Sequence, residues 1–237
     1  DGGKAIVASC GGRLVADLEA IGAHHVTLDL KTKNPVTIWT NAGRLAQLIA
    51  DEKIDLIHAR SRAPAWSAKW AARRAHIPFV TTYHGFYKAK GKLKRWYNSI
   101  MAQGDLVIAN SDFTAAHVRT EHEIEEQRLR VIPRGVDLDL FDPAKINPDR
   151  IRAQRSTWGA GPERLAIVLP GRLTRWKGQG LMIEALARLR LDPAPLLVCL
   201  GEGGDKLEYQ AELKAAAEQA GIDLALPGHT TDIAAAY

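Results

Sequence analysis

The stretch RLAIVLPGRLTRWKGQGLMIEAL, residues 164–186, decides the fold of this chain. Its first part, RLAIVLPG (164–171), is a short run rich in Ile, Val and Leu, which is typical of a strand buried in a parallel sheet. Gly171 permits a tight turn, and the pattern that follows predicts a helix over residues 178–190. A strand, a turn and a helix in this order predict an α/β fold.

The same alternation extends along most of the chain. Short apolar runs are separated by amphipathic segments, and Ser111 or Asp112 is expected to cap the helix after the fifth run. Right-handed crossovers then give open parallel sheets covered by helices on both faces. Strands are predicted at residues 5–9, 25–30, 54–59, 79–84, 105–111, 129–133, 164–171, 195–203 and 224–228.

The alternation is interrupted over residues 139–163, which contain three prolines. This composition predicts a linker with one short helix near Arg150 to Trp158. We place an N-terminal domain at 1–145, the linker at 146–162 and a C-terminal domain at 163–237. Because the second sheet has only three predicted strands, we expect that domain to be incomplete and the sequence to be a fragment.

The composition is that of an ordinary soluble protein, with 46% hydrophobic and 25% charged residues among 237. No apolar run reaches the roughly 18 residues that a membrane-spanning helix needs. Residues 1–10 lack the apolar stretch of a signal peptide. Cys10 and Cys199 each lie in an apolar run, so we expect two buried free thiols, with a disulfide as the less favoured alternative, and no metal site.

The net charge of +5 comes largely from two basic clusters. Such clusters attract phosphate groups, but a solvated face explains them equally well. The first cluster contains Arg60, Arg62, Lys69, Arg73 and Arg74, and the second contains Lys88, Lys90, Lys92, Lys94 and Arg95.

Candidate ligand-binding residues follow the predicted strands, because ligands of open parallel sheets bind at the carboxyl ends of the strands. Arg172 and Lys177 flank the start of a helix, where unpaired backbone N–H groups also favour anions, so this loop suits a diphosphate. The alternative is a polar loop whose cations face water. His84 ends the strand at 79–84 and could donate to an oxygen or carry a proton, although a structural histidine is the more common case.

Two further strand ends carry weaker signals. Gly201 and Gly203 would let a ligand ring approach the backbone closely, although a simple turn explains them as well. His58, Arg60 and Arg62 follow another strand and could bind an anion.

Taken together, these motifs resemble family-four glycosyltransferases, which have the GT-B fold. The run VIPRGVDLDLFDP (131–143) resembles the interdomain signature of that family, in which an Asn often stands at the position of Arg134. LPGRLTRWKGQGLMIEAL (169–186) has the form of its phosphate-binding segment. TTYHG, VIANSDFTAAHV and LGEGGDKLEYQAELKAAAEQAG match further motifs, so the resemblance covers nearly the whole chain.

The resemblance implies two Rossmann-like, doubly wound domains, with a nucleotide-diphosphate sugar as donor substrate, retention of the anomeric configuration, and no metal or other cofactor. It implies that Arg172 and Lys177, next to Gly171, grip the diphosphate and that His84 lies near the donor sugar. Main chain at Gly201, Gly203, Gly228 and His229 would border the base and ribose.

We further expect a glycan or lipid-linked acceptor, as in lipopolysaccharide or other envelope pathways, and a cytoplasmic protein that contacts the anionic inner membrane face. The family's first strand and its later pair of glutamates are absent from these residues, so we expect the chain alone to be inactive. The alternatives are a sugar-nucleotide epimerase of the same fold and a non-catalytic phosphate- or nucleotide-binding module. No nucleic-acid motif supports a nucleic-acid partner.

Overall fold

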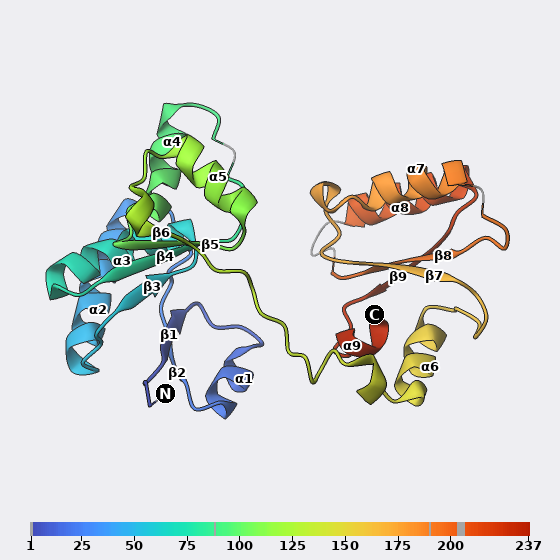
Figure 1. Cartoon of the computed structure of the whole chain (residues 1–237), viewed down its shortest axis with the longest axis horizontal. Helices are drawn as coiled ribbons and strands as arrows, with labels where there is room; N and C mark the ends of the chain where they lie inside the picture. The colour runs from blue at the N-terminus through green and yellow to red at the C-terminus, as the bar shows by residue number, and fades with distance from the viewer. Residues whose placement is uncertain (1, 88, 190, 203–206) are drawn as a thin grey trace. The chain divides into compact units, whose positions relative to one another are not determined.

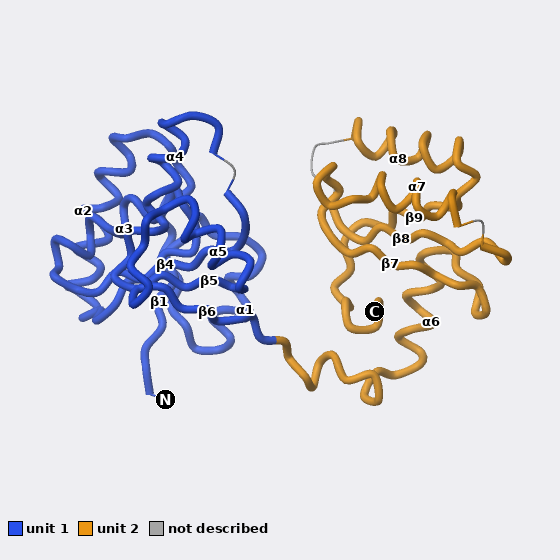
Figure 2. The backbone as a smooth tube through the Cα atoms, turned by 45° about the horizontal axis from the view of Figure 1, so that its top comes forward, with its two compact units in different colours: residues 1–135 blue, residues 136–237 orange. Residues whose placement is uncertain are grey.

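A computed structural model describes residues 2–87, 89–189, 191–202 and 207–237. The chain divides into two compact units, residues Asp1–Gly135 and Val136–Tyr237, which are coloured separately in Figure 2. The division therefore falls ten residues before the boundary that we placed at residue 145.

Unit 1 consists of alternating strands and helices, as the periodicity predicts (Figure 1). Ser111 accepts a hydrogen bond from the Thr114 backbone N–H, which confirms the predicted cap of the fifth helix. The elements are β1 (Ile6–Ser9), α1 (Val15–Ala20), β2 (His24–Thr27), α2 (Pro35–Asp51), β3 (Ile57–Ala59), α3 (Arg62–Ala75), β4 (Phe79–Tyr83), α4 (Lys92–Ser99), β5 (Leu106–Ala109), α5 (Asp112–Glu121) and β6 (Leu129–Val131), with short 3-10 helices at Ile100–Ala102 and Glu126–Arg128.

Among the described residues of unit 1, the strand pairs are all parallel and form two sheets. β1 pairs with β2, and the other strands form a four-stranded sheet in the order β3-β4-β5-β6. Every residue of β4 is buried, because apolar side chains from α3, α5 and the Ile100–Ala102 turn pack beside this central strand. The α/β class with parallel sheets is confirmed, and the strand order places the ends of β3 to β6 next to one another.

Unit 2 repeats the same architecture with a sheet in the order β7-β8-β9. Figure 1 shows α7 and α8 on one face of this sheet and α6 and α9 on the other. Apolar residues of β8 contribute to the core on both faces. The elements are α6 (Pro148–Thr157), β7 (Ala166–Pro170), α7 (Gln179–Leu189), β8 (Leu196–Leu200), α8 (Leu207–Ala220), β9 (Asp223–Gly228) and α9 (Ile233–Ala236), with 3-10 turns at Pro143–Lys145 and Arg175–Lys177.

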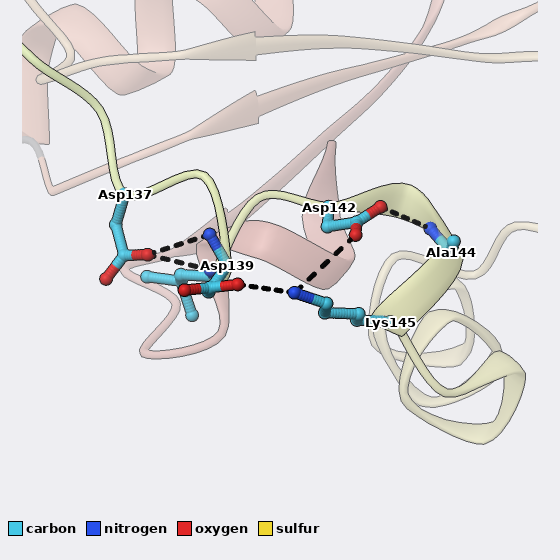
Figure 3. A network of polar contacts seen from close by, with 6 residues as sticks. Asp137, Asp139, Asp142, Ala144 and Lys145 are labelled. Atoms are coloured by element: carbon cyan, nitrogen blue, oxygen red, sulfur yellow. Dashed lines mark hydrogen bonds and ion pairs between the residues drawn. The ribbon is translucent and has the colours of Figure 1, made fainter.

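The aspartates of the 131–143 motif organise the first turns of unit 2 (Figure 3). The Asp137 carboxylate accepts hydrogen bonds from the backbone N–H groups of Asp139 and Leu140, at 3.0 and 2.9 Å. Asp142 caps the next turn through Ala144 N at 3.0 Å, and the Lys145 ammonium pairs with Asp139 and Asp142. Local side-chain to backbone hydrogen bonds of this kind fix a turn without a hydrophobic core.

The segment 146–162, which the sequence suggests as a linker, lies within unit 2. Its helix α6 packs against α9, and Arg150 forms two hydrogen bonds with the Asp232 carboxylate at 2.8 and 2.6 Å. Trp158 is buried in the same apolar cluster as Leu196 and Ala236. The proline and glycine content of residues 146–162 therefore indicates an irregular backbone, but it does not indicate that this segment packs against the rest of unit 2.

The two cysteines differ in environment. Cys199 lies in β8 and is buried, and this burial raises the pKa of its thiol to about 11. Cys10 is exposed, so the expectation of a buried thiol is wrong at that position. The reason is that β1 ends at Ser9, one residue before the cysteine.

Candidate functional site

In unit 2, three glycines meet at the carboxyl ends of β7, β8 and β9. Gly171 N donates to Leu200 O at 2.7 Å, and Gly201 N donates to Gly228 O at 2.8 Å. Gly201 has φ +142°, and a Cβ on it would lie 2.3 Å from Gly171 O. The backbone at Gly201 thus crosses that at Gly171 so closely that only glycine fits, and we call this contact the glycine crossing. Together with Gly228, it brings the ends of the three strands into contact.

The cations predicted to bind a diphosphate lie beside this glycine crossing. Arg172 directly follows Gly171, and the side chain of Lys177 passes over Gly171, where an added Cβ would lie 3.5 Å from Lys177 Cδ. The Lys177 ammonium lies 4.4 Å from the centre of the Trp176 ring. Both cations are exposed, and neither forms an ion pair with any residue in the described part of the chain.

Arg175, in the same turn, is held differently from these two cations. Its guanidinium forms an ion pair with Glu212 at 2.6 Å and lies 5.2 Å from the centre of the Tyr209 ring. That pairing raises the pKa of Arg175, mainly through the hydrogen bond to Glu212. Arg175 is therefore a structural cation, which the sequence does not distinguish from Arg172 and Lys177.

Gln179 is a positioning residue that sequence inspection does not single out. It is fully buried at the first position of α7, and its amide nitrogen donates to Arg172 O at 3.1 Å. Tyr209 donates in turn to the Gln179 side-chain oxygen at 3.4 Å. A buried amide needs hydrogen-bond partners, and the only signal for it in the sequence is a polar residue at the start of an otherwise apolar helix.

Two other residues predicted to border the donor follow the strand ends of this unit. His229 follows β9 and is exposed, next to Gly228. Gly203 lies outside the described residues. Thus Gly171, Arg172, Lys177, Gly201 and Gly228 are brought together, and their role in binding stays a prediction.

In unit 1, His84 directly follows β4 and lies between two arginines. Arg60 Nε is 3.3 Å from His84 Nε2, and Arg134 Nη2 is 2.9 Å from His84 Nδ1. Asn110 donates to the His84 carbonyl oxygen at 3.4 Å, which fixes the backbone at the end of the strand. The three side chains come from segments that follow β3, β4 and β6.

The surroundings of His84 disfavour its charged form. Burial is the largest cause that lowers the pKa of His84, and the positive charges of Arg60 and Arg134 lower this pKa further. The pKa of His58 is lowered by burial and by Arg60, and its Nε2 lies 2.7 Å from Thr82 Oγ1. Two neutral imidazoles and two guanidinium groups therefore share this edge of the sheet near pH 7.

The contact of Arg134 with His84 is not apparent in the sequence, where 50 residues separate the two. The sequence indicates this contact only through the positions of the two arginines, because each follows a predicted strand and the carboxyl ends of parallel strands lie at one edge of the sheet. His84 belongs to unit 1, whereas Arg172 and Lys177 belong to unit 2. A common site between them stays a prediction.

Comparison with known proteins finds a matching family model and similar glycosyltransferases. The model of the family described as Glycosyltransferase Family 4 matches residues 2–140. A D-inositol 3-phosphate glycosyltransferase of Jonesia denitrificans is 28% identical over 191 residues, covering 71% of this chain and 43% of the relative. The chain thus spans less than half the length of that curated relative.

Solved structures share the fold. A glycosyltransferase from Rickettsia africae is 32% identical with a TM-score of 0.84, and the match covers 100% of this chain and 62% of that one. Anabaena Alr3699/HepE, solved in complex with UDP-glucose, is 21% identical with a TM-score of 0.78 over 98% of this chain and 63% of its own. Within the described residues, no helix is both long and apolar enough to cross a bilayer.

Proposed function

The chain belongs to Glycosyltransferase Family 4, and from this premise we propose that the protein transfers a sugar from a nucleotide-diphosphate donor to an acceptor with retention. One observation carries the proposal. Arg172 and Lys177 are exposed at the glycine crossing of unit 2 without a carboxylate partner among the described residues, whereas Arg175 in the same turn is paired.

In this proposal the two cations bind the donor diphosphate. Negative charge develops on the leaving nucleotide during transfer, so fixed positive charge at that point stabilises the transition state more than the ground state. Gly171 and Gly201 hold the ends of β7 and β8 in close contact next to these cations, and in this proposal the main chain at Gly228 borders the donor. Gln179 fixes the Arg172 backbone. We expect these cations to suffice without a resident cofactor, and His84 to contribute a neutral imidazole.

The test is a binding screen of the chain against a panel of sugar nucleotides that includes UDP-glucose. We expect one donor to bind, and Arg172→Ala and Lys177→Ala each to weaken it by about tenfold, as for loss of a charge-assisted hydrogen bond. Arg175→Ala is the matched control, because it removes the same charge from the same turn. Binding and its dependence on the cations should persist in a chelator.

Two outcomes would contradict the proposal. One is the absence of binding by every sugar nucleotide in the panel. The other is equal weakening by Arg175→Ala, which would show that general positive charge rather than the Arg172–Lys177 pair holds the ligand.

We also propose that the acceptor is a glycan or lipid-linked glycan at the cytoplasmic face of a membrane. Helix α4 supports this placement, since Leu93 and Trp96 are 78% and 57% exposed one turn apart. Lys92 and Lys94 lie on the same helix, whereas its Arg95 forms an ion pair with Glu121 at 3.6 Å. Basic and apolar side chains on one short helix suit an anionic lipid surface.

Vesicle co-sedimentation tests this part separately. The chain should sediment with vesicles of anionic phospholipid at low salt and much less with zwitterionic vesicles or at high salt. Leu93→Ser with Trp96→Ser should reduce binding, whereas Trp39→Ser, which removes a similarly exposed tryptophan from α2, should not. Binding that ignores lipid charge would remove the membrane proposal and leave the donor proposal intact.

A further inference from the structure

The cluster of Arg60, His84 and Arg134 contains more hydrogen-bond donors than acceptors. Both ring nitrogens of His84 face a guanidinium group, at 3.3 Å from Arg60 and 2.9 Å from Arg134. A neutral imidazole has one lone pair and one N–H, so it accepts from only one of the two arginines. The other guanidinium then directs an N–H toward a nitrogen that already carries a proton.

No acidic side chain compensates for this excess among the residues that the structure describes. The groups that lower the pKa of His84 electrostatically are Arg60, Arg134 and, least, His58, all of them basic. Arg60 and Arg134 form no ion pair with the described residues, and both are exposed at the edge of the sheet. Other exposed arginines do find carboxylates, as Arg119 does with Glu126 and Arg150 with Asp232.

An anionic oxygen ligand would satisfy the arrangement. Guanidinium groups bind phosphate or carboxylate oxygens through paired hydrogen bonds, and two of them within reach of one imidazole define a small anion site. The neutral ring could donate its N–H to a further oxygen, because the pKa of His84 is lowered by burial and by the same two arginines. Three segments distant in sequence build this site, after β3, β4 and β6.

We propose that Arg60 and Arg134 bind an anionic group, a phosphate or a carboxylate, on the acceptor, and thereby select a negatively charged acceptor. The identification of the ligand as the acceptor rests on the proposed transferase function. The anion site itself rests on the contacts of Arg60, His84 and Arg134 in unit 1. In this proposal Arg60 and Arg134 determine acceptor specificity, whereas the proposed function assigns the donor diphosphate to Arg172 and Lys177 of unit 2.

The experiment follows the ring signals of His84 by NMR in the full chain, assigned through His84→Gln. Glucose 6-phosphate and glucuronate serve as the phosphate and carboxylate probes, and glucose is the neutral reference. We expect at least one anionic probe to shift the ring signals in a saturable manner and glucose to have no effect. Arg60→Gln and Arg134→Gln should each weaken that probe by about tenfold, as expected for lost charge-assisted contacts.

Arg44→Gln is the matched control, since it removes an exposed arginine from α2 in the same unit. It should leave the affinity unchanged. Comparison of the two probes tells which anion the site prefers, and either preference supports the inference. Because the wild-type titration is informative alone, a variant that fails to fold does not prevent a decision.

Three results would overturn the inference. The first is no shift of the His84 signals with either anionic probe, or an equal shift with glucose. The second is unchanged affinity in both arginine variants. The third is displacement of the probe by UDP, which would assign the site to donor phosphates. The sugar-nucleotide screen at Arg172 and Lys177 is a separate readout, so failure of the donor proposal is distinguishable from failure of the anion site.

Discussion

Replacement of Gly201 by alanine tests the contact that joins the ends of β7 and β8. The added Cβ would lie 2.3 Å from Gly171 O, 2.7 Å from Gly171 C and 3.2 Å from Arg172 N. All three are backbone atoms, so no side-chain rotation can relieve the overlap. The strands must separate, or the chain must leave its φ of +142°.

The expected cost has two parts. A non-glycine residue in this region of φ costs on the order of 1–3 kcal/mol. Forcing extra volume into packed structure typically costs roughly another 1–3 kcal/mol. Gly201→Ala should therefore destabilise unit 2 by roughly 2–6 kcal/mol, a large part of the stability of a small domain.

Urea unfolding combined with peptide-resolved hydrogen exchange is the suitable assay, because two units need not unfold together. Exchange should accelerate in β7, β8 and β9 and stay unchanged in β3 to β6. Since Arg172 N is one of the displaced atoms, affinity for any sugar nucleotide bound by the wild-type chain should also fall.

Gly180→Ala is the matched control. Gly180 lies in α7, and a Cβ added to it would meet no atom within 4 Å apart from its chain neighbours and the backbone of its own helix, so alanine should be neutral or stabilising by up to about 1 kcal/mol. A Gly201→Ala protein with unfolding free energy within about 0.5 kcal/mol of wild type, a change typical of a surface site, would refute the reasoning. It would mean that the crossing of Gly201 over Gly171 is looser than these distances imply.

Two further predictions concern the stability of each unit. Trp158→Ala should lower the free energy of unfolding of unit 2 by about 3–5 kcal/mol in urea, because it leaves a cavity at a buried site. Trp176→Ala, at a side chain 69% exposed, should change this free energy by less than about 0.5 kcal/mol. Equal effects of the two substitutions would contradict the burial assignment. Acidification should destabilise unit 1, because burial lowers the pKa of each of four histidines below its unfolded value of about 6.5. Just below that pH the unfolded chain therefore binds more protons than the folded unit, which favours unfolding. This stability is complete above about pH 6.5 and is lost as the pH falls through the lower folded values, so urea unfolding followed at pH 7, 6 and 5 should show a decline, and a flat profile would count against it. The histidines are His58, His84, His117 and His122.

Local features were predictable where neighbouring residues carry the signal. The apolar run at 195–203 forms β8, Leu196–Leu200, and every residue of that strand is buried. Ser111 caps α5 through an N–H only three residues away. Periodicity and capping act over a few residues, so a single sequence determines them with no knowledge of what packs on the element.

Element boundaries and exposure were less predictable. Cys10 has apolar neighbours before it but lies beyond the end of β1, and is exposed. The segment 146–162 has the composition of a linker, yet α6 packs on α9 through Arg150 and Asp232, 82 residues apart. A residue's burial depends on which distant segment covers it, and composition carries no record of that segment.

The sequence by itself therefore determined the α/β class, the order of strands and helices, the family resemblance and the candidate cations Arg172 and Lys177. Only the tertiary structure separated these two from the paired Arg175, and only it joined Arg60, His84 and Arg134. The physical reason is the distance along the chain over which each interaction acts. Helices, strands and turns form between near neighbours, whereas charge pairing and close backbone crossings depend on the order in which the strands assemble into a sheet.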